Sequence, residues 1–476
     1  MKLTSGKLSD NPEELKAIIF GQGEHIVLLE EQIRILKKAI FGRKTEKRCP
    51  DEGEGGLQLH LFNEAEVLVE QETQKKLLIP EHTRQIPRRE PLPKDLPRVD
   101  VIHDIDESEK VCECGAELSR IGEEVCEKLD IIPAKIRVLR HIRPKYACKS
   151  CEGVESEGPT VRICPPPPQI IPKGIATPGL VAHIAIAKYC DALPLYRQEK
   201  IFSRYGVDLS RSTMADWMVK AAECCSPLMD LLVSSLHSGP LVNVDETPLQ
   251  VLNEPERANT TKSYMWVFRG GPPDKPVVVF RYSPTRSGEV PREVLAGYCG
   301  YCQTDAFSGY NALEVANPGI RMVGCFFHTR RNFVKIIDAR PKASRNKPGS
   351  AEVALEYIGQ LYKIEKVARQ RELSPDQVVA LRQEQAVPVL EEFKAWIDMR
   401  IGQTPPQGLL GKALSYAFTQ WPKLIRYIEN GHITPDNNVA ENNLRPFVVG
   451  RKNWLFSGHP NGAHAAATLY TLIETA

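Results

Sequence analysis

The chain has 476 residues, and its 62 Lys and Arg against 60 Asp and Glu give a formal net charge of +2. At about 150 residues per domain, this length predicts about three domains. The composition, 42% hydrophobic and 26% charged, is that of a globular protein and excludes a disordered chain. The near-zero charge excludes a nucleic-acid partner only if the charges are evenly spread, and they are not. Basic residues dominate 34–48, 321–347 and 445–452, whereas 51–72 is acidic.

The sequence also bears on the compartment in which the protein works. Residues 1–20 alternate charged and apolar residues, unlike a signal peptide. The most apolar stretch, residues 179–190, is too short for a membrane span and contains His183 and Lys188. Thirteen cysteines, an odd number, without an export signal favour metal ligands and buried thiols over disulfides. We therefore expect a soluble cytoplasmic protein with no membrane partner.

The first 48 residues have the spacing of a leucine-zipper-like coiled coil. Seam residues recur at intervals of three and four over nearly four heptads: Leu15, Ile19, Gln22, Ile26, Leu29, Ile33, Leu36 and Ile40. This period favours a homo-oligomer, at least a dimer, over an amphipathic helix packed on its own domain. The basic residues that follow, 34–48, suit DNA phosphates or a solvated face.

Two cysteine pairs in residues 98–164 predict a small zinc ribbon. Cys112 and Cys114 form the first pair, and Cys148 and Cys151 form the second. A strand-like run, residues 135–142, lies between them, so four thiolates around a structural Zn²⁺ would replace a core too small to fold alone. The first pair is one residue tighter than usual, so His103, Cys126 or His141 could replace a ligand, and buried free thiols are the alternative. Residues 49–97, acidic and then proline-punctuated, are interpreted as a linker.

Residues 165–238 are predicted to be helical after a run of four prolines. Helices are expected at 179–189, 196–205 and 212–224, and the third begins with Ser and Thr residues after a glycine turn. This order is compatible with a DNA-binding helix-turn-helix, with Arg211 near the start of its last helix, but ordinary helical packing is the alternative that a weak signal favours.

Residues 239–476 have the pattern of a mixed α/β sheet. Three short β-runs at 241–244, 264–269 and 277–282 are followed by alternating helical and β segments, with further strands at 298–304 and 322–327. Three strands and then helix, strand, helix and strand is the order of a ribonuclease-H-like (RNase H-like) fold. The helical residues of 351–427 form an insertion, at about 340–434, within this catalytic domain.

Acidic residues occur where this sheet would gather them. Asp245 ends the first strand and Asp305 the fourth, and these strands are neighbours in the topology, so their carboxylates could share Mg²⁺. A third acid, Glu441, lies on the rim of a helix that begins at Asp436 or Asn437. Ala440, Leu444 and Phe447 form the apolar side of that helix. Glu246 faces away from Asp245 on the strand and is a poor substitute ligand.

Basic residues flank these acids. Pro446 is expected to kink or end the helix, which would place Arg451, Lys452, Asn453 and Trp454 in a separate segment suited to phosphates and base stacking. Arg445 lies one turn after Glu441. Between 321 and 347 basic residues dominate, and Arg330, Arg331 and Lys335 are the best candidates there for contacts with the DNA backbone.

Four motifs resemble transposases of the insertion sequence 66 family, of the TnpC type. They are Asn-Val-Asp-Glu-Thr-Pro at 243–248, Gln-Thr-Asp-Ala-Phe-Ser-Gly-Tyr at 303–310, Gly-Cys-Phe-Phe-His-Thr-Arg-Arg at 324–331, and the long Asp-Asn-Asn-Val-Ala-Glu-Asn-Asn-Leu-Arg-Pro motif from Asp436. The resemblance also covers the zipper and the cysteine region, in the family's order. It implies that Asp245, Asp305 and Glu441 are a DDE triad.

The resemblance further implies what such a protein does. Two Mg²⁺ or Mn²⁺ ions on the triad would serve cleavage at the element's terminal inverted repeats and strand transfer into target DNA. The protein would be bacterial and nucleoid-associated, and small accessory transposition proteins are expected as partners. Cys325 and His328 match the family's Cys-x-x-His element. Three roles are open for this pair: Cys325 and His328 could form half of a zinc site, His328 could face the scissile phosphate, or both could serve structural packing.

Two other functions remain open from the sequence alone. The chain stops at Ala476, inside a predicted helix at 463–475, whereas family members usually continue. A catalytically inactive or truncated remnant that only binds DNA and oligomerises is therefore the main alternative. A ribonuclease-H-like nuclease without a role in transposition ranks behind it, because it would not need a zipper and a ribbon.

Overall fold

The computed structural model describes residues 168–172, 174–305, 307–310, 312–340 and 349–476. It also describes shorter pieces nearer the N-terminus: residues 16, 22–23, 25–26, 29–33, 136, 138–139, 145–147 and 161–163. The chain divides into two units, Leu77–Pro166 and the remainder, which comprises Met1–Lys76 and Pro167–Ala476. In the part of the chain that is described, no helix has both the length and the apolar character needed to cross a membrane.

The smaller unit contains a two-stranded antiparallel sheet. Strand β1, Lys145–Ala147, pairs with β2, Val161–Ile163. Strand β1 ends directly before Cys148, so a β-segment adjoins the second cysteine pair. All four predicted zinc ligands, and the basic residues 34–48, lie outside the described residues. The described residues between 22 and 33 are helical, as the zipper spacing predicts, and Ile26, Leu29 and Ile33 are 56%, 43% and 50% exposed.

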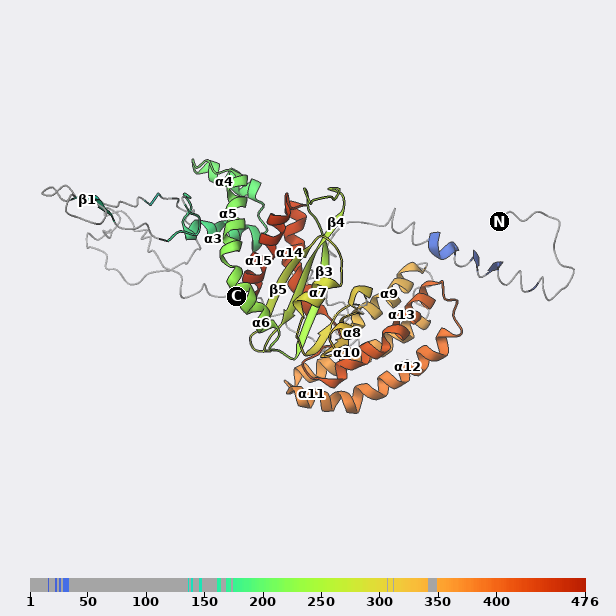
Figure 1. The fold of residues 1–476 in the computed structure, drawn as a ribbon. Helices are drawn as coiled ribbons and strands as arrows, with labels where there is room; N and C mark the ends of the chain where they lie inside the picture. Colours follow the sequence, from blue (N-terminus) through green and yellow to red (C-terminus); the bar gives the residue numbers. More distant parts are fainter. Residues whose placement is uncertain are drawn as a thin grey trace, which may run out of the picture. The chain divides into compact units, whose positions relative to one another are not determined.

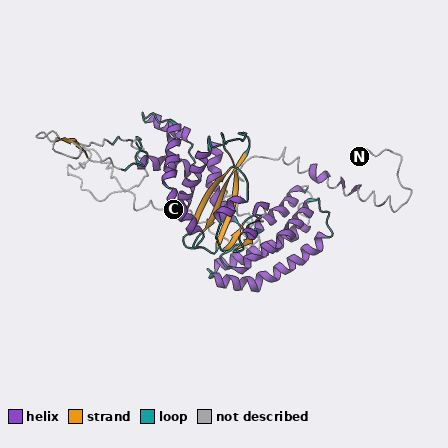
Figure 2. Ribbon diagram, viewed as in Figure 1, coloured by secondary structure: helices purple, strands orange, loops and turns teal. Residues whose placement is uncertain are grey.

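A five-stranded mixed sheet forms the centre of the larger unit (Figure 2). Its strands are β3, Leu241–Gln250; β4, Lys262–Gly270; β5, Val277–Ser283; β6, Gly300–Gln303; and β7, Ile320–Val323. They lie in the order β5-β4-β3-β6-β7, with β3, β4 and β5 antiparallel and β6 and β7 parallel to β3. The predicted order of elements is confirmed, and so is the predicted contact between the first and fourth strands.

Helices cover both faces of this sheet because its strands alternate two apolar sets of side chains. Leu249, Met265 and Phe280 belong to one core, which they share with helices at both ends of the described region. These helices are α3, Pro178–Tyr189; α4, Leu195–Arg204; α5, Arg211–Cys224; α14, Asn438–Trp454; and α15, Pro460–Thr475. Helices α14 and α15 lie against the strands, and Figure 1 shows them beside the sheet. The helices predicted after the prolines, α3, α4 and α5, share this core, and α3 and α5 pack on α15.

The opposite face packs against shorter helices. Val244, Trp266 and Val279 form a second core with this set. Its helices are α6, Ser226–Leu236; α7, Glu289–Val294; the short η3, Ser308–Tyr310; and α8, Leu313–Ala316. Helix α6 was not predicted from the sequence.

The predicted insertion is a helical bundle with its own core (Figure 1). Phe333, Phe393 and Trp421 are among its buried residues. Its elements are α9, Phe326–Ala339; α10, Ser350–Gln370; α11, Pro375–Leu381; η5, Arg382–Ala386; α12, Val387–Ile401; α13, Leu409–Leu424; and η6, Ile425–Glu429. Phe326 and Phe327 begin α9 and are not part of the preceding strand, which is shorter than predicted.

The prediction that residues 451–454 form a separate segment after Pro446 is wrong, because the helix does not end at this proline. Helix α14 continues from Asn438 through Pro446 to Trp454. A proline inside a helix removes one backbone hydrogen bond, but buried packing here opposes that loss. Phe447, the next residue, is fully buried and contacts the rings of Phe280, Tyr470 and Trp454. Tertiary contacts on both sides of Pro446 thus keep the helix continuous.

Candidate active site

Asp245 was predicted to end the first strand, but it lies within strand β3. Strand β3 runs on to Gln250 because β4 pairs with it along its whole second half. The parallel partner β6, however, pairs only with Leu241–Asn243. At Asp245, therefore, β3 is no longer paired with β6, and that side of the strand is open to other groups.

Asp305 follows β6 at the level of Asp245. Asn243 is paired with Gln303, so the two aspartates occupy equivalent positions two residues further along parallel strands. The Oδ1 atom of Asp305 accepts a hydrogen bond from the backbone N–H of Phe307 at 2.9 Å. The side chain of Asp305 is 23% exposed, which leaves it accessible from solvent.

Glu441 lies in the first turn of α14, with Ala440, Leu444 and Phe447 buried as predicted. Asn437 is the N-cap residue by position, but its side chain does not cap the helix. Oδ1 of Asp436 instead accepts from the backbone N–H of Asn438 at 3.1 Å. The amide of Asn437 is thereby free to form contacts with the sheet.

Three buried amides fasten the elements that carry the acids. Nδ2 of Asn243 donates to Oε1 of Gln303 at 2.9 Å and to Oδ1 of Asn437 at 3.0 Å. Nδ2 of Asn437 donates to the carbonyl oxygen of Val244 at 2.9 Å, and Nε2 of Gln303 donates to that of Thr434 at 2.7 Å. We call Asn243, Gln303 and Asn437 the amide cluster. It joins β3, β6 and the start of α14, and so sets the backbone spacing of the three acids.

The amide cluster was not predicted from the sequence, although the sequence contains a signal for it. Asn243 and Gln303 each precede an aspartate by two residues, and on a regular strand such residues share one side, as Asn243 and Asp245 do on β3. All three amides are 1% exposed or less. A polar residue at a buried strand position needs a partner, and a repeated amide-x-Asp pattern on two neighbouring strands suggests that the partners are each other.

The acids interact electrostatically. Burial raises the pKa of Asp245 well above its ordinary value, and the carboxylates of Glu246, Glu441 and Asp305 raise it further. Burial, and then Asp436, raise the pKa of Glu441 to about 7, while the positive charge of Arg331 opposes that shift. Mutual repulsion between carboxylates in a partly buried site is relieved by a shared cation.

The donor set therefore fits Mg²⁺ or Mn²⁺, which prefer carboxylate oxygens. The described residues nevertheless contain no group of three or more His, Cys, Asp or Glu side chains close enough together to hold a metal ion. The three acids share an electrostatic environment without being gathered at ligand distances.

Helix α9 brings basic side chains to these acids. Arg331 and Lys335 are exposed and lie one turn apart. The pKa of His328 is lowered, mainly by burial and also by the positive charges of Arg331 and Lys335, while the carboxylate of Asp305 acts to raise it. The buried Nδ1 of His328 has no hydrogen-bond partner. Arg330 is only 5% exposed, because it lies one turn after the buried Phe326 on the packed side of the helix. Arg330 is thus less accessible than Arg331 and Lys335, and its contact with DNA stays a prediction.

Cys325 is buried and packs at the junction of β7, α9 and α14. Its Sγ atom accepts a hydrogen bond from the backbone N–H of Asn437 at 3.2 Å. Burial raises the pKa of its thiol, which opposes formation of the thiolate that binds zinc. Of the three interpretations of Cys325 and His328, this arrangement favours structural packing for Cys325.

The basic end of α14 is largely engaged with the protein itself. Arg445 is half-buried, and Lys452 is exposed. Arg451 donates to Oγ1 of Thr247 at 3.0 Å and to the carbonyl oxygen of Pro248. Asn453 donates to the carbonyl oxygen of Ala192 at 3.0 Å, and the ring of Trp454 lies beneath Nζ of Lys188 at 5.4 Å. Contact of these residues with DNA stays a prediction.

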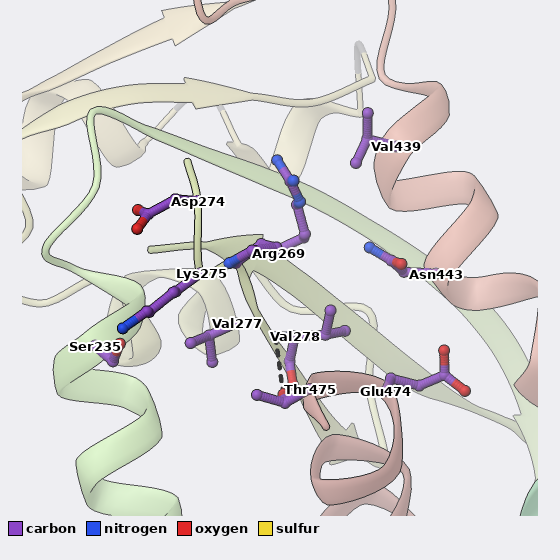
Figure 3. A pocket seen from close by; sticks show the side chains of 11 residues that line it. Ser235, Arg269, Asp274, Lys275, Val277, Val278, Val439, Asn443, Glu474 and Thr475 are labelled. Carbon is purple, nitrogen blue, oxygen red and sulfur yellow. Dashed lines mark hydrogen bonds between the residues drawn. The ribbon is translucent and has the colours of Figure 1, made fainter. Parts of the chain in front are cut away.

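A pocket of about 520 Å³ adjoins α14 but is not the acidic site (Figure 3). Val439 and Asn443 line it, together with Arg269 of β4 and Thr475 of α15. Glu441 lies two residues from both Val439 and Asn443, so its side chain projects from the opposite side of the helix. The pocket and the carboxylates therefore lie on different sides of α14.

Most of the chain is similar to known protein families. Residues 173–465 match the family model for the transposase IS66 family, which includes all three acids. Residues 109–152 match the zinc-finger binding domain of transposase IS66, which includes the four cysteines, and residues 28–101 match a model described as transposase C of IS166 homeodomain.

Two relatives from Sinorhizobium fredii align with this chain over most of its length. The protein y4jD is 33% identical over 398 residues, which are 81% of this chain and 74% of y4jD. The protein y4qI is 30% identical over 484 residues, which are 97% of this chain and 84% of y4qI. Both are described as uncharacterized proteins, so they add length and order to the similarity but no activity.

Proposed function

Because this chain belongs to the IS66 family of transposases, we propose that it is the enzyme that moves its own insertion sequence. It binds the terminal inverted repeats, cleaves the DNA strands there, and joins the freed ends to target DNA by DDE phosphoryl transfer. The observation that carries this proposal is the register of β3 and β6, which sets Asp245, within β3, level with Asp305, two residues after β6. Glu441 interacts electrostatically with both.

The sheet supports an RNase H-like catalytic domain. Three antiparallel strands precede two strands that lie parallel to the first, and the first strand is central. In such a sheet the central strand and its parallel neighbour end on the same side, so side chains that follow them can be brought together there as the acids of a phosphoryl-transfer enzyme. Asp245 and Asp305 lie on that side, and the amide cluster attaches α14 with Glu441 to it.

Asp245, Asp305 and Glu441 would hold two Mg²⁺ or Mn²⁺ ions. When bound, such ions lower the pKa of the attacking water or 3′-hydroxyl and neutralise the leaving oxygen. The protein would contribute carboxylates at fixed backbone positions, and bound cations would replace the protons that the raised pKa values of Asp245 and Glu441 favour. Exposed Arg331 and Lys335 on α9, whose charges act on His328 beside Asp305, would bind the phosphates of the DNA strand and position it against the acids.

The N-terminal parts would provide assembly and DNA binding. Ile26, Leu29 and Ile33 are largely exposed in the single chain, and pairing this seam with a second copy would bury it. Cys112, Cys114, Cys148 and Cys151 would bind one structural Zn²⁺. Analytical ultracentrifugation should give at least a dimer, which Leu29→Asp disrupts. Metal analysis should give at least one zinc per chain, which Cys148→Ser with Cys151→Ser removes.

The activity is tested with DNA that carries the inverted repeats flanking the gene. Purified protein and Mn²⁺ should release cleaved 3′ ends and strand-transfer products. Asp245→Asn and Glu441→Gln preserve side-chain volume but remove a carboxylate, so they should still bind the repeats and should yield no product. Wild-type protein that gives no product above Asp245→Asn would contradict the proposal.

A DNA-binding remnant without catalysis is the second candidate. It is favoured by the separation of the acids, since the described residues contain no ready cluster of metal ligands. The same experiment distinguishes the two, because the remnant binds the repeats specifically while neither metal nor the acid substitutions change the DNA. Cleavage without preference for the repeats would instead indicate a nuclease that has no role in transposition.

A further inference from the structure

We propose that Arg286 is a positioning residue for Asp305, that Glu246 anchors it, and that this arrangement sets the affinity of the site for a divalent cation. The inference rests on the proposed function, since it concerns one of the three acids proposed to bind metal. It assigns a role to Glu246, the acid next to Asp245 that is itself a poor ligand.

Glu246 is a buried carboxylate with two partners. Its side chain is 2% exposed and projects from the face of β3 opposite to Asp245. Oε1 accepts a hydrogen bond from Nε of Arg286 at 2.6 Å, and Oε2 accepts one from the hydroxyl of Tyr310 at 2.5 Å. A buried charge with two such bonds is fixed in place, which makes Glu246 a firm anchor.

Tyr310 ties this anchor to the segment that carries Asp305. Its ring is 1% exposed and packs edge-to-face on Trp266 of β4, at 5.9 Å between centroids, and on Phe307, at 5.8 Å. Tyr310 and Phe307 both lie between β6 and α8, within five residues of Asp305. One carboxylate on β3 thus holds two parts of the Asp305 segment, Tyr310 directly and Asp305 through Arg286.

Arg286 lies just after β5 and reaches both acids. Its Nη2 atom forms an ion pair with Glu246 and lies 3.7 Å from Oδ2 of Asp305. The guanidinium carbon lies 3.7 Å from the centroid of the Phe307 ring, a cation–π contact that fixes the plane of the group. A planar fork held on one carboxylate and stacked on a ring presents its remaining N–H groups in a defined direction, here toward Asp305.

The distances indicate which contact persists when a cation binds. The contact with Glu246 is the closer one, and that with Asp305 is longer than a hydrogen bond. Asp305 can therefore ligate a cation while Arg286 stays on Glu246. The carboxylates of Glu246 and Asp305 and the guanidinium of Arg286 together have a net charge of about −1, which can attract the cation. Without Arg286, Glu246 would be an uncompensated buried charge, and Asp305 would keep only its bond from the backbone of Phe307.

The test measures Mn²⁺ binding to the full-length protein by calorimetry, which does not depend on DNA cleavage. Arg286→Gln and Glu246→Gln should each weaken Mn²⁺ binding by about 10-fold or more, the usual effect of removing an outer partner of a metal ligand. The double variant should be no weaker than the worse single one, because both act through one contact. Arg286→Lys, which keeps the charge without the fork, should lie between. Arg292→Gln, in an exposed pair with Glu289 on α7, should bind as wild type does.

Two results would overturn the inference. If Arg286→Gln binds Mn²⁺ as tightly as wild type or more tightly, Arg286 only competes with the cation. If wild type binds no better than Asp305→Asn, the proposed function fails as well, and that result is distinct from the first. Circular dichroism shows whether each variant is folded. Should Arg286→Gln not fold, Arg286→Lys and Glu246→Gln carry the test, and equal affinity with wild type for both would refute it.

Discussion

The side-chain amide of Asn437 donates a 2.9 Å hydrogen bond to the carbonyl oxygen of Val244, the residue directly before Asp245. The two residues are almost 200 positions apart in the sequence. Through this contact the start of the helix that carries Glu441 is attached to the strand that carries Asp245. The amide cluster thus connects the acids through the backbone and not through their own carboxylates.

Asn437→Ala should therefore affect both stability and activity. The change leaves buried polar groups of Asn243 and Val244 with one partner fewer, so we expect a loss of about 1–3 kcal/mol in the free energy of unfolding. Urea denaturation measures it. Strand cleavage should fall as well at temperatures where the variant is folded, because α14 loses its attachment to β3. Asn442→Ala, at an exposed amide on the same helix, is the matched control and should change neither. Equal effects of the two changes would contradict the role of the amide cluster.

The acids should make stability fall as pH rises in metal-free buffer. The pKa of Glu441 rises from 4.5 to about 7 on folding, so the folded chain holds this proton more tightly than the unfolded chain. The stabilisation is complete below pH 4.5 and is lost as pH passes through 7. Asp245, whose pKa is also raised, acts in the same direction. Urea denaturation in a chelating buffer at several pH values should show this slope.

Glu441→Gln should flatten part of that slope, because the amide does not titrate. In the wild-type protein, Mn²⁺ at pH 7.5 should restore the stability that is lost at this pH, because the cation replaces the proton as the partner of the carboxylates. An identical pH slope in wild type and Glu441→Gln would show that Glu441 does not titrate in this way.

Features set by local period and strand order were predictable from the sequence. The strand order followed from the sequence of β and helical segments, and it placed Asp245 and Asp305 on neighbouring strands without any knowledge of tertiary contacts. The buried side of α14 followed from the spacing of Ala440, Leu444 and Phe447. The buried side of α14 needs only the 3.6-residue period of a helix, whereas the neighbouring positions of the two strands come from the RNase H-like order of elements.

Features decided by distant contacts were not predictable. Pro446 is a helix breaker by local rules, and it stays in a helix because Phe447 packs against rings from β5 and α15. Arg330 looks like a surface cation in a basic run, yet the packing of α9 buries it. Arg286 carries no sequence signal that links it to Glu246, 40 residues earlier, or to Asp305, and only the fold brings it to both.

Arg382 should be the most sensitive charged residue of the helical bundle. It is 1% exposed and forms two bonds with Glu365, at 2.8 and 2.7 Å. It also donates to the carbonyl oxygens of Tyr427, Asn430 and Ile433, the last residue lying three positions before Asp436. Arg382→Met leaves a buried carboxylate unpaired, and we expect a loss of about 3–5 kcal/mol.

Chemical denaturation of Arg382→Met measures this loss. The double variant with Glu365→Leu should recover part of it, because the unpaired charge is then removed. Arg292→Met breaks an exposed pair of the same type and should cost about 0–1 kcal/mol. A cost for Arg382→Met as small as that of Arg292→Met would show that water reaches Glu365 in the folded bundle.

Thr471 should stabilise the edge of the five-stranded sheet. Strand β5 is an edge strand, so some of its backbone N–H groups have no strand to pair with. The hydroxyl of Thr471 accepts from the N–H of Phe280 at 2.8 Å, and that of Thr475, one turn later on α15, accepts from Val278 at 3.1 Å. Thr471 is fully buried, so water cannot replace its hydroxyl. Thr471→Val should therefore lower the free energy of unfolding by about 1–3 kcal/mol.

Two further variants separate the hydroxyl from the rest of the side chain. Thr471→Ser keeps the acceptor and should recover most of the stability lost in Thr471→Val. Thr475→Val should cost less than Thr471→Val, because Thr475 is only partly buried and water can reach Val278. Urea denaturation at one pH compares all three. If Thr471→Val is as stable as wild type, the N–H of Phe280 does not depend on α15, and the helix covers the edge of β5 through apolar contacts alone.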